Sequence, residues 1–126
     1  MHAFRKLSVW RKAHELALRV YQAAPLIGRH YPALAGRMLR AAHGIPANIA
    51  EGSGRSTGAQ FANFLQIAIG SARELDYYRL LAADLGAIPR SQHATLGART
   101  EEVIMMLVGL KRTVKRSRRP PTPPPA

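Results

Sequence analysis

Cysteine is absent from the 126 residues of this chain. Its absence excludes disulfide bonds, thiolate nucleophiles and cysteine-based metal sites, and it leaves the redox compartment open. Long apolar runs are missing too, since none approaches the roughly 18 residues that cross a bilayer. The first ten residues lack the apolar segment of a secretory signal peptide. We therefore expect a cytoplasmic protein with no membrane partner.

Acidic and aromatic residues are scarce. Seven Asp and Glu face nineteen Lys and Arg, which gives a formal net charge of +12, and aromatic residues make up 6% of the chain. A charge of this size says more about partners than about fold, and it favours a polyanion or an acidic protein face. Fifteen of the cations are Arg, whose planar guanidinium matches phosphate and carboxylate.

Apolar residues, at 47%, are plentiful enough for one globular domain. They recur at steps of three and four, which is typical of amphipathic helices. The helical segments are about 8–24, 32–51, from Thr57 to just before Gly86, and from Ser91 through Val114. These segments predict an all-α protein, an up-down-up-down antiparallel four-helix bundle over residues 1–117. Residues 118–126, rich in Pro and Arg, are predicted to form a disordered tail.

The expected helix ends rest on a few residues. Ser8, Thr57 and Ser91 are expected N-caps, with Gln60 completing a capping box beside Thr57, while Pro25, Gly28 and Gly86 are expected to stop helices.

Pro46 interrupts the second segment and leaves two interpretations. Inside a helix it removes the bond to the carbonyl of Ala42, at a cost of roughly 3 kcal/mol. Either the helix ends near Gly44, or it continues to about residue 51 with a kink. The apolar step from Ile45 to Ile49 favours the kinked helix.

The sequence contains no motif typical of a catalytic or metal site. Residues 52–58 are rich in glycine but lack the spacing of a dinucleotide fingerprint and the Lys of a P-loop, so they predict a tight turn between helices. His14 and Glu15 begin a zinc-protease motif whose second His is missing. No Glu has a His three residues later, as di-iron bundles require. We expect no catalytic residue, no metal and no cofactor.

Four polar residues, Asn48 with Glu51 and Ser71 with Glu74, form pairs three residues apart on the second and third helices. That spacing puts each pair on one helix face. The four either form a hydrogen-bonded cluster, joined by Arg55 or Arg40, that fixes the register of the helices, or they line a site for a ligand or a metal. The structural interpretation is preferred because so basic a chain offers many Arg partners.

The basic residues give the stronger functional indication. They gather near both termini, as Arg5, Lys6, Arg11, Lys12, Lys111, Arg112, Lys115, Arg116, Arg118 and Arg119. An even number of antiparallel helices brings both groups to one end of the bundle. A few cations would suit a helix C-terminal dipole. Ten favour binding to the phosphate backbone of RNA or DNA, with weak sequence preference and strong salt dependence, because aromatics for base stacking are few.

Two other functions stay open from the residues alone. The cations would equally meet an acidic protein partner, which makes the chain a protein–protein adaptor. A small-molecule enzyme built on Asn48, Glu51 and Glu74 is the third possibility.

Several motifs resemble a known family. They are Phe4-x-Lys-Leu-x-Val-Trp-x-Lys-Ala-x-Glu-Leu16, Tyr21, Ile45-Pro-Ala-Asn-Ile-Ala-Glu-Gly52, Phe61-x-x-Phe-Leu65 and Ala68-x-Gly-Ser-Ala-x-Glu-Leu75. Together, over about residues 4–112, they resemble the four-helix-bundle proteins encoded by intervening sequences in bacterial large-subunit ribosomal RNA genes. The string over residues 45–52 is the most specific of them.

The resemblance implies an up-down bundle that assembles as a homopentameric ring. It also implies kinship with the accessory variability proteins of diversity-generating retroelements, basic bundles that bind a reverse transcriptase and nucleic acid. A reverse transcriptase is thus one acidic partner to consider. The family supplies no catalytic residues. His43 and Gly44 depart from its usual small polar residue before Ile45, and the tail from about residue 117 has no counterpart in it.

Overall fold

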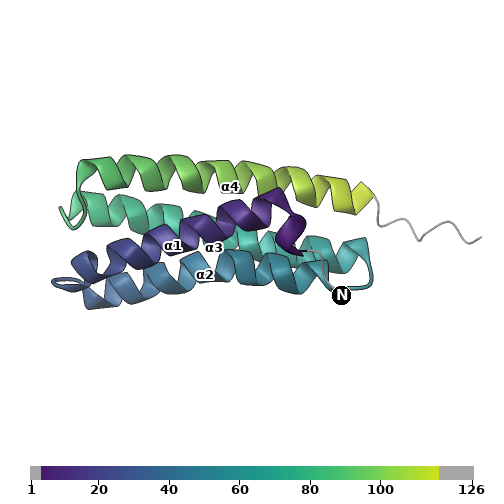
Figure 1. Cartoon of the computed structure of the whole chain (residues 1–126), viewed down its shortest axis with the longest axis horizontal. Coiled ribbons are helices and arrows are strands. Elements are labelled where there is room, and N and C mark those ends of the chain that lie inside the picture. The colour runs from purple at the N-terminus through teal and green to yellow at the C-terminus, as the bar shows by residue number, and fades with distance from the viewer. Residues whose placement is uncertain (1–3, 117–126) are drawn as a thin grey trace, which may run out of the picture.

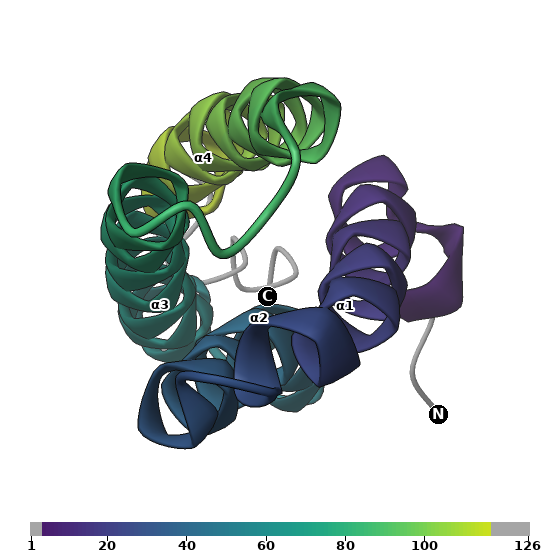
Figure 2. The same ribbon diagram turned by 90° about the vertical axis from the view of Figure 1, so that its left-hand side faces the viewer.

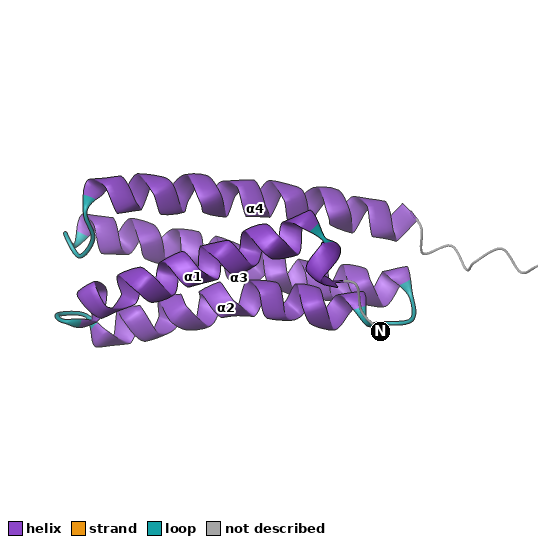
Figure 3. Ribbon diagram, in the orientation of Figure 1, coloured by secondary structure: helices purple, strands orange, loops and turns teal. Residues whose placement is uncertain are grey.

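The computed structural model describes residues 4–116. Four α-helices make up most of this part of the chain: α1 (Ser8–Gly28), α2 (Pro32–Ser53), α3 (Gly58–Asp84) and α4 (Arg90–Arg116), with a short 3-10 helix, η1 (Phe4–Lys6), before α1. Successive helices run antiparallel, and α4 returns beside α1 to close the bundle (Figure 1, Figure 2). The described residues contain no strand (Figure 3). The predicted all-α four-helix bundle is confirmed, and the predicted tail, 118–126, lies outside the described residues.

The core is one apolar layer running the length of the bundle. Its largest fully buried side chains come from all four helices: Leu16, Val20, Ile27, Met38, Ile45, Ile49, Leu65, Leu75, Val103 and Leu107. Alanines such as Ala13, Ala42 and Ala72 fill positions between them and are also fully buried. Because interaxial distance follows side-chain size, this mixture of large and small residues lets neighbouring helices approach closely.

Proline does not end either of the helices that contain it. Helix α1 continues through Pro25, so the predicted end at residue 24 is wrong, and it ends at Gly28, which was expected to stop it. Pro25 is exposed, and the carbonyl that it leaves without a helical partner belongs to Tyr21, also an exposed residue. Helix α2 continues through Pro46 to Ser53, in agreement with the preferred interpretation.

Two of the expected caps are confirmed. The Thr57 hydroxyl accepts a hydrogen bond from the Gln60 backbone N–H at 3.1 Å, although the Gln60 side chain meets Ser56 instead of completing the capping box. Gly86 has a φ of +71°, and the chain reverses there with the Ala87 N–H donating to the carbonyl of residue 82.

The other two expected caps are wrong. Leu7 is the N-cap of α1 and makes no side-chain cap bond, so Ser8 is the first residue inside the helix. Helix α4 begins at Arg90, which puts Ser91 inside its first turn.

Candidate nucleic-acid interface

The last turns of α4 carry a group of cations close together in the sequence. Lys111 is half-buried, and its Nζ donates to Gln66 Oε1 of α3 at 2.6 Å, which holds the end of α4 against α3. Arg112, Lys115 and Arg116 are exposed and have no side-chain hydrogen bond or ion pair with any other residue in 4–116. Three positive side chains therefore stand free at this end of the molecule. Arg118 and Arg119 lie outside the described residues.

The cations near the N-terminus are mostly paired. Arg11 Nη1 donates to the Arg5 carbonyl oxygen at 3.1 Å and so holds η1 against α1. Arg5 also lies 6.0 Å from the ring of Phe4. Lys12 Nζ lies 3.6 Å from Glu102 Oε2, an ion pair that crosses from α1 to α4. Of this group, only Lys6 has no partner within the described part of the chain.

The two groups share one end of the bundle, as the topology predicted (Figure 1). They do not form one continuous face, because η1 packs against α1 and α2 while Lys111 contacts α3. The Lys12–Glu102 pair aligns the start of α1 with the middle of α4. Arg116 follows about 21 Å farther along α4 at 1.5 Å per residue, so the C-terminal cations extend beyond the start of α1.

Arg55, in the turn between α2 and α3, lies at the same end; the sequence singled it out as an arginine joining the polar cluster, not as part of the basic group. Its Nη2 lies 2.5 Å from Glu51 Oε2, and its guanidinium carbon lies 4.8 Å from the ring centre of Phe64. The topological rule that brings the two termini together also places the α2–α3 turn there, so the signal was available. Since Glu51 offsets its charge, Arg55 adds little to the positive field.

The predicted inter-helix cluster is not formed, since its hydrogen bonds stay within single helices. Asn48 Nδ2 donates to the Gly44 carbonyl at 2.7 Å, and Glu74 Oε2 accepts from the Tyr78 hydroxyl at 3.0 Å. Glu51 pairs with Arg55, as above. Ser71 alone meets the other helix, where a Cβ built on Gly44 would lie 3.3 Å from its Oγ. Close packing of small residues, rather than a polar network, sets this contact between α2 and α3.

Two further findings concern only the described residues. Over 4–116, no three His, Asp or Glu side chains are grouped as a metal ion would need. In that same part of the chain, no helix combines the length and the hydropathy that crossing a membrane requires.

Comparisons with known proteins bear on the family. The family model described as 23S rRNA-intervening sequence protein matches residues 5–109. A solved structure from Bacteroides thetaiotaomicron VPI-5482, described as a protein with unknown function from the S23 ribosomal protein family, aligns with a TM-score of 0.78 and 25% identity. The alignment covers 82% of this chain and 98% of that one. A search among curated proteins finds no match. The resemblance seen in the motifs is confirmed, and the chain belongs to the 23S rRNA-intervening sequence protein family.

Proposed function

We propose that this protein is a non-enzymatic, oligomeric scaffold whose basic end binds the phosphate backbone of RNA or DNA. The observation that carries the proposal is the set of exposed cations Arg112, Lys115 and Arg116 on α4, which have no partner among residues 4–116. Cations that are not offset by carboxylates attract phosphates over a distance and gain affinity by releasing counterions from nucleic acid. Lys6 adds a further free charge at the same end.

The few aromatic side chains near this end support recognition of the backbone rather than of bases. Trp10 is half-buried, with the ring of Phe4 edge-on at 5.0 Å and the ring of His14 stacked at 4.9 Å. A ring engaged in this way offers little free face for stacking on a base. We accordingly expect weak sequence preference and a steep dependence on salt.

The proposal includes self-association in the cytoplasm, as a homopentameric ring. A ring would present the basic end of each subunit to the same polyanion. Linked contacts of this kind raise apparent affinity by roughly 10²–10⁴ without any new contact, provided that the geometry permits simultaneous binding.

The alternative is an adaptor for an acidic protein, such as a reverse transcriptase. The same guanidinium groups that match phosphate also match carboxylates, and Arg112 and Arg116 would serve either partner. The two functions differ in the partner that must bind with high affinity: nucleic acid for the scaffold and an acidic protein for the adaptor.

A salt-titrated binding assay against structured RNA, single-stranded RNA and duplex DNA tests the proposal. The test variant replaces Arg112, Lys115 and Arg116 with Ala and keeps Lys111, whose contact with Gln66 supports the fold. The matched control replaces Arg37, Arg40 and Arg73 with Ala, three exposed cations without partners in the described residues.

Removing three phosphate contacts is expected to make the slope of log binding constant against log salt shallower by up to about 2.7 for duplex DNA. The control should keep most of the original slope. Equal losses in both variants would mean that binding follows net charge and not the end of α4. No binding of any ligand near 0.1 M salt overturns the proposal and favours the acidic protein partner.

A further inference from the structure

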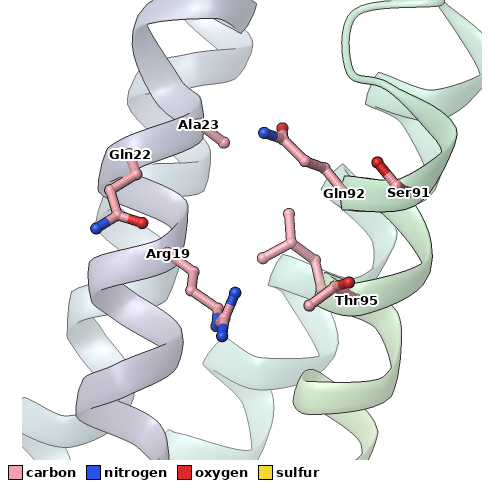
Figure 4. A pocket seen from close by; sticks show the side chains of 7 residues that line it. Arg19, Gln22, Ala23, Ser91, Gln92 and Thr95 are labelled. Atoms are coloured by element: carbon pink, nitrogen blue, oxygen red, sulfur yellow. The ribbon is translucent and has the colours of Figure 1, made fainter.

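A second set of unpaired polar side chains lies along the seam between α1 and α4, toward the opposite end of the bundle. A hollow of about 150 Å³ opens there. It is lined by Arg19, Gln22 and Ala23 of α1 and by Ser91, Gln92, Thr95 and Leu96 of α4. Figure 4 shows the guanidinium of Arg19 and the amide of Gln92 extending from the two helices toward the space between them.

The polar side chains of this hollow are unused by the fold. Within residues 4–116, Arg19, Gln22, Ser91, Gln92 and Thr95 make no side-chain hydrogen bond or ion pair. Five polar side chains from two helices thus line one hollow without a partner among residues 4–116, and those of Arg19 and Gln92 extend into it (Figure 4).

Arg79 of α3 shows the contrasting case of an arginine that the fold does use. Its Nη2 lies 2.6 Å from Asp76 Oδ1, its Nη1 lies 3.0 Å from His93 Nδ1, and its side chain is only 12% exposed. A guanidinium held in this way is structural, whereas that of Arg19 is left free to bind.

A neighbouring hollow of about 280 Å³ continues from the first along α1, and Arg19 lines both. Arg99 of α4 also lines this second hollow, so arginines of two helices border it. Glu15 lies there as well but forms no ion pair with a described residue. Two arginines against one carboxylate leave the groove positive, and an anion between the helices would relieve the repulsion between like charges.

The size of the first hollow limits what it can hold. Its volume of about 150 Å³ is below the roughly 300–1,000 Å³ of pockets that bury a drug-sized ligand. A phosphate group, one phosphorus with four oxygens, is much smaller than such a ligand. The forked guanidinium of an arginine matches two phosphate oxygens at once.

We propose that the α1–α4 groove binds a single phosphoryl group. Arg19 donates two hydrogen bonds to it, Arg99 contributes the second positive charge, and Ser91, Gln92 and Thr95 donate the remaining hydrogen bonds. The site uses none of the cations at the basic end, so it stands apart from the function proposed above. The group belongs either to a small phosphate ester or to the terminal phosphate of a nucleic acid.

Equilibrium dialysis of the full chain against radiolabelled inorganic phosphate, at ionic strength held constant with NaCl, tests the site. The test variant is Arg19→Gln, and the matched control is Arg37→Gln, which removes the same charge from an exposed position on α2. We expect saturable binding of one phosphate per chain, weakened at least tenfold by Arg19→Gln and changed less than twofold by Arg37→Gln. Binding that does not saturate, or that both variants weaken equally, overturns the proposal. Thermal unfolding by circular dichroism confirms that each variant is folded.

Two further arms identify the source of the group and separate the two proposals. The first arm compares an oligonucleotide with and without a 5′-phosphate. If the phosphorylated form binds better and Arg19→Gln removes that preference, the site is assigned to nucleic-acid ends. If both forms bind equally while inorganic phosphate still binds, the site is assigned to small esters. The variant lacking Arg112, Lys115 and Arg116 should still bind inorganic phosphate. If that variant loses phosphate binding, the groove is not the site.

Discussion

At the scale of single residues, Gly52 of α2 lies in close contact with α3. A Cβ built there would lie 2.7 Å from Phe64 Cβ and 2.9 Å from Phe61 Cδ1. Such distances are closer than real Cβ atoms tolerate, and both neighbours are bulky rings attached to a long helix. The space that this glycine leaves empty is therefore part of the helix–helix contact.

We predict that Gly52→Ala lowers the free energy of unfolding by about 1–3 kcal/mol, because the added methyl group overpacks the contact. Gly36→Ala is the matched control: Gly36 also lies inside α2, but nothing stands within 4 Å of its added Cβ. There the gain in helix propensity should raise stability by about 0.5–1 kcal/mol. Urea unfolding at fixed protein concentration measures both, and a stabilising effect of both substitutions would refute the close contact.

Some side-chain contacts could be predicted from the sequence, and others could not. Glu51 and Glu74 each have a partner four residues later, Arg55 and Tyr78, so the ordinary spacing of helix neighbours already pointed to local bonds. The α1–α4 groove carries no such signal. Arg19 and Gln92 are far apart in the sequence, belong to no motif, and come together only through the packing of the first helix against the last.

At the scale of elements, the four helices were predictable because apolar spacing is a local property. The predicted end of α1 at residue 24 was wrong because Pro25 was expected to stop the helix although the apolar spacing continues past it. The buried residues Ala24 and Ile27 flank Pro25 and continue the apolar stripe across it, just as Ile45 and Ile49 continue the stripe across Pro46. The predicted N-caps at Ser8 and Ser91 were wrong for a different reason. Residue types that can cap a helix are common, and only the backbone geometry decides which of them lies at the cap position.

We predict that Pro25→Ala stabilises the protein by about 1–2 kcal/mol. The substitution restores an N–H that can bond to the Tyr21 carbonyl, and it removes the clash of the proline ring. Part of this gain in stability is offset because the unfolded chain becomes more flexible. Because Pro25 is exposed, little packing is lost. Pro46→Ala should gain less stability, since Pro46 is buried and removal of its ring leaves a gap in the packing. Denaturant unfolding compares the two, and a loss of stability for Pro25→Ala would mean that its ring is covered in an assembly.

At the scale of the whole molecule, charge opposes the assembly that the family resemblance implies. Each chain carries a formal net charge of +12, so neighbouring subunits in a ring repel one another. The surface also exposes large apolar side chains, among them Leu18, Tyr21, Ile67 and Met105, which are between 47% and 68% exposed. Burial of such groups between subunits would supply the attraction, and it does not depend on charge.

Salt screens the repulsion between subunits but not the apolar attraction. Raising NaCl from 0.1 M to 1 M shortens the Debye length from about 10 Å to about 3 Å. Repulsion between subunits weakens, so light scattering should give a mass five times that of the 13.8-kDa chain at both salt concentrations. Binding to duplex DNA should fall by orders of magnitude over the same range, because the phosphate contacts lose their counterion-release gain. A mass that drops to one chain at 1 M salt would mean that ion pairs hold the assembly. A single-chain mass at both concentrations would refute the ring and leave any nucleic-acid affinity to one basic end acting alone.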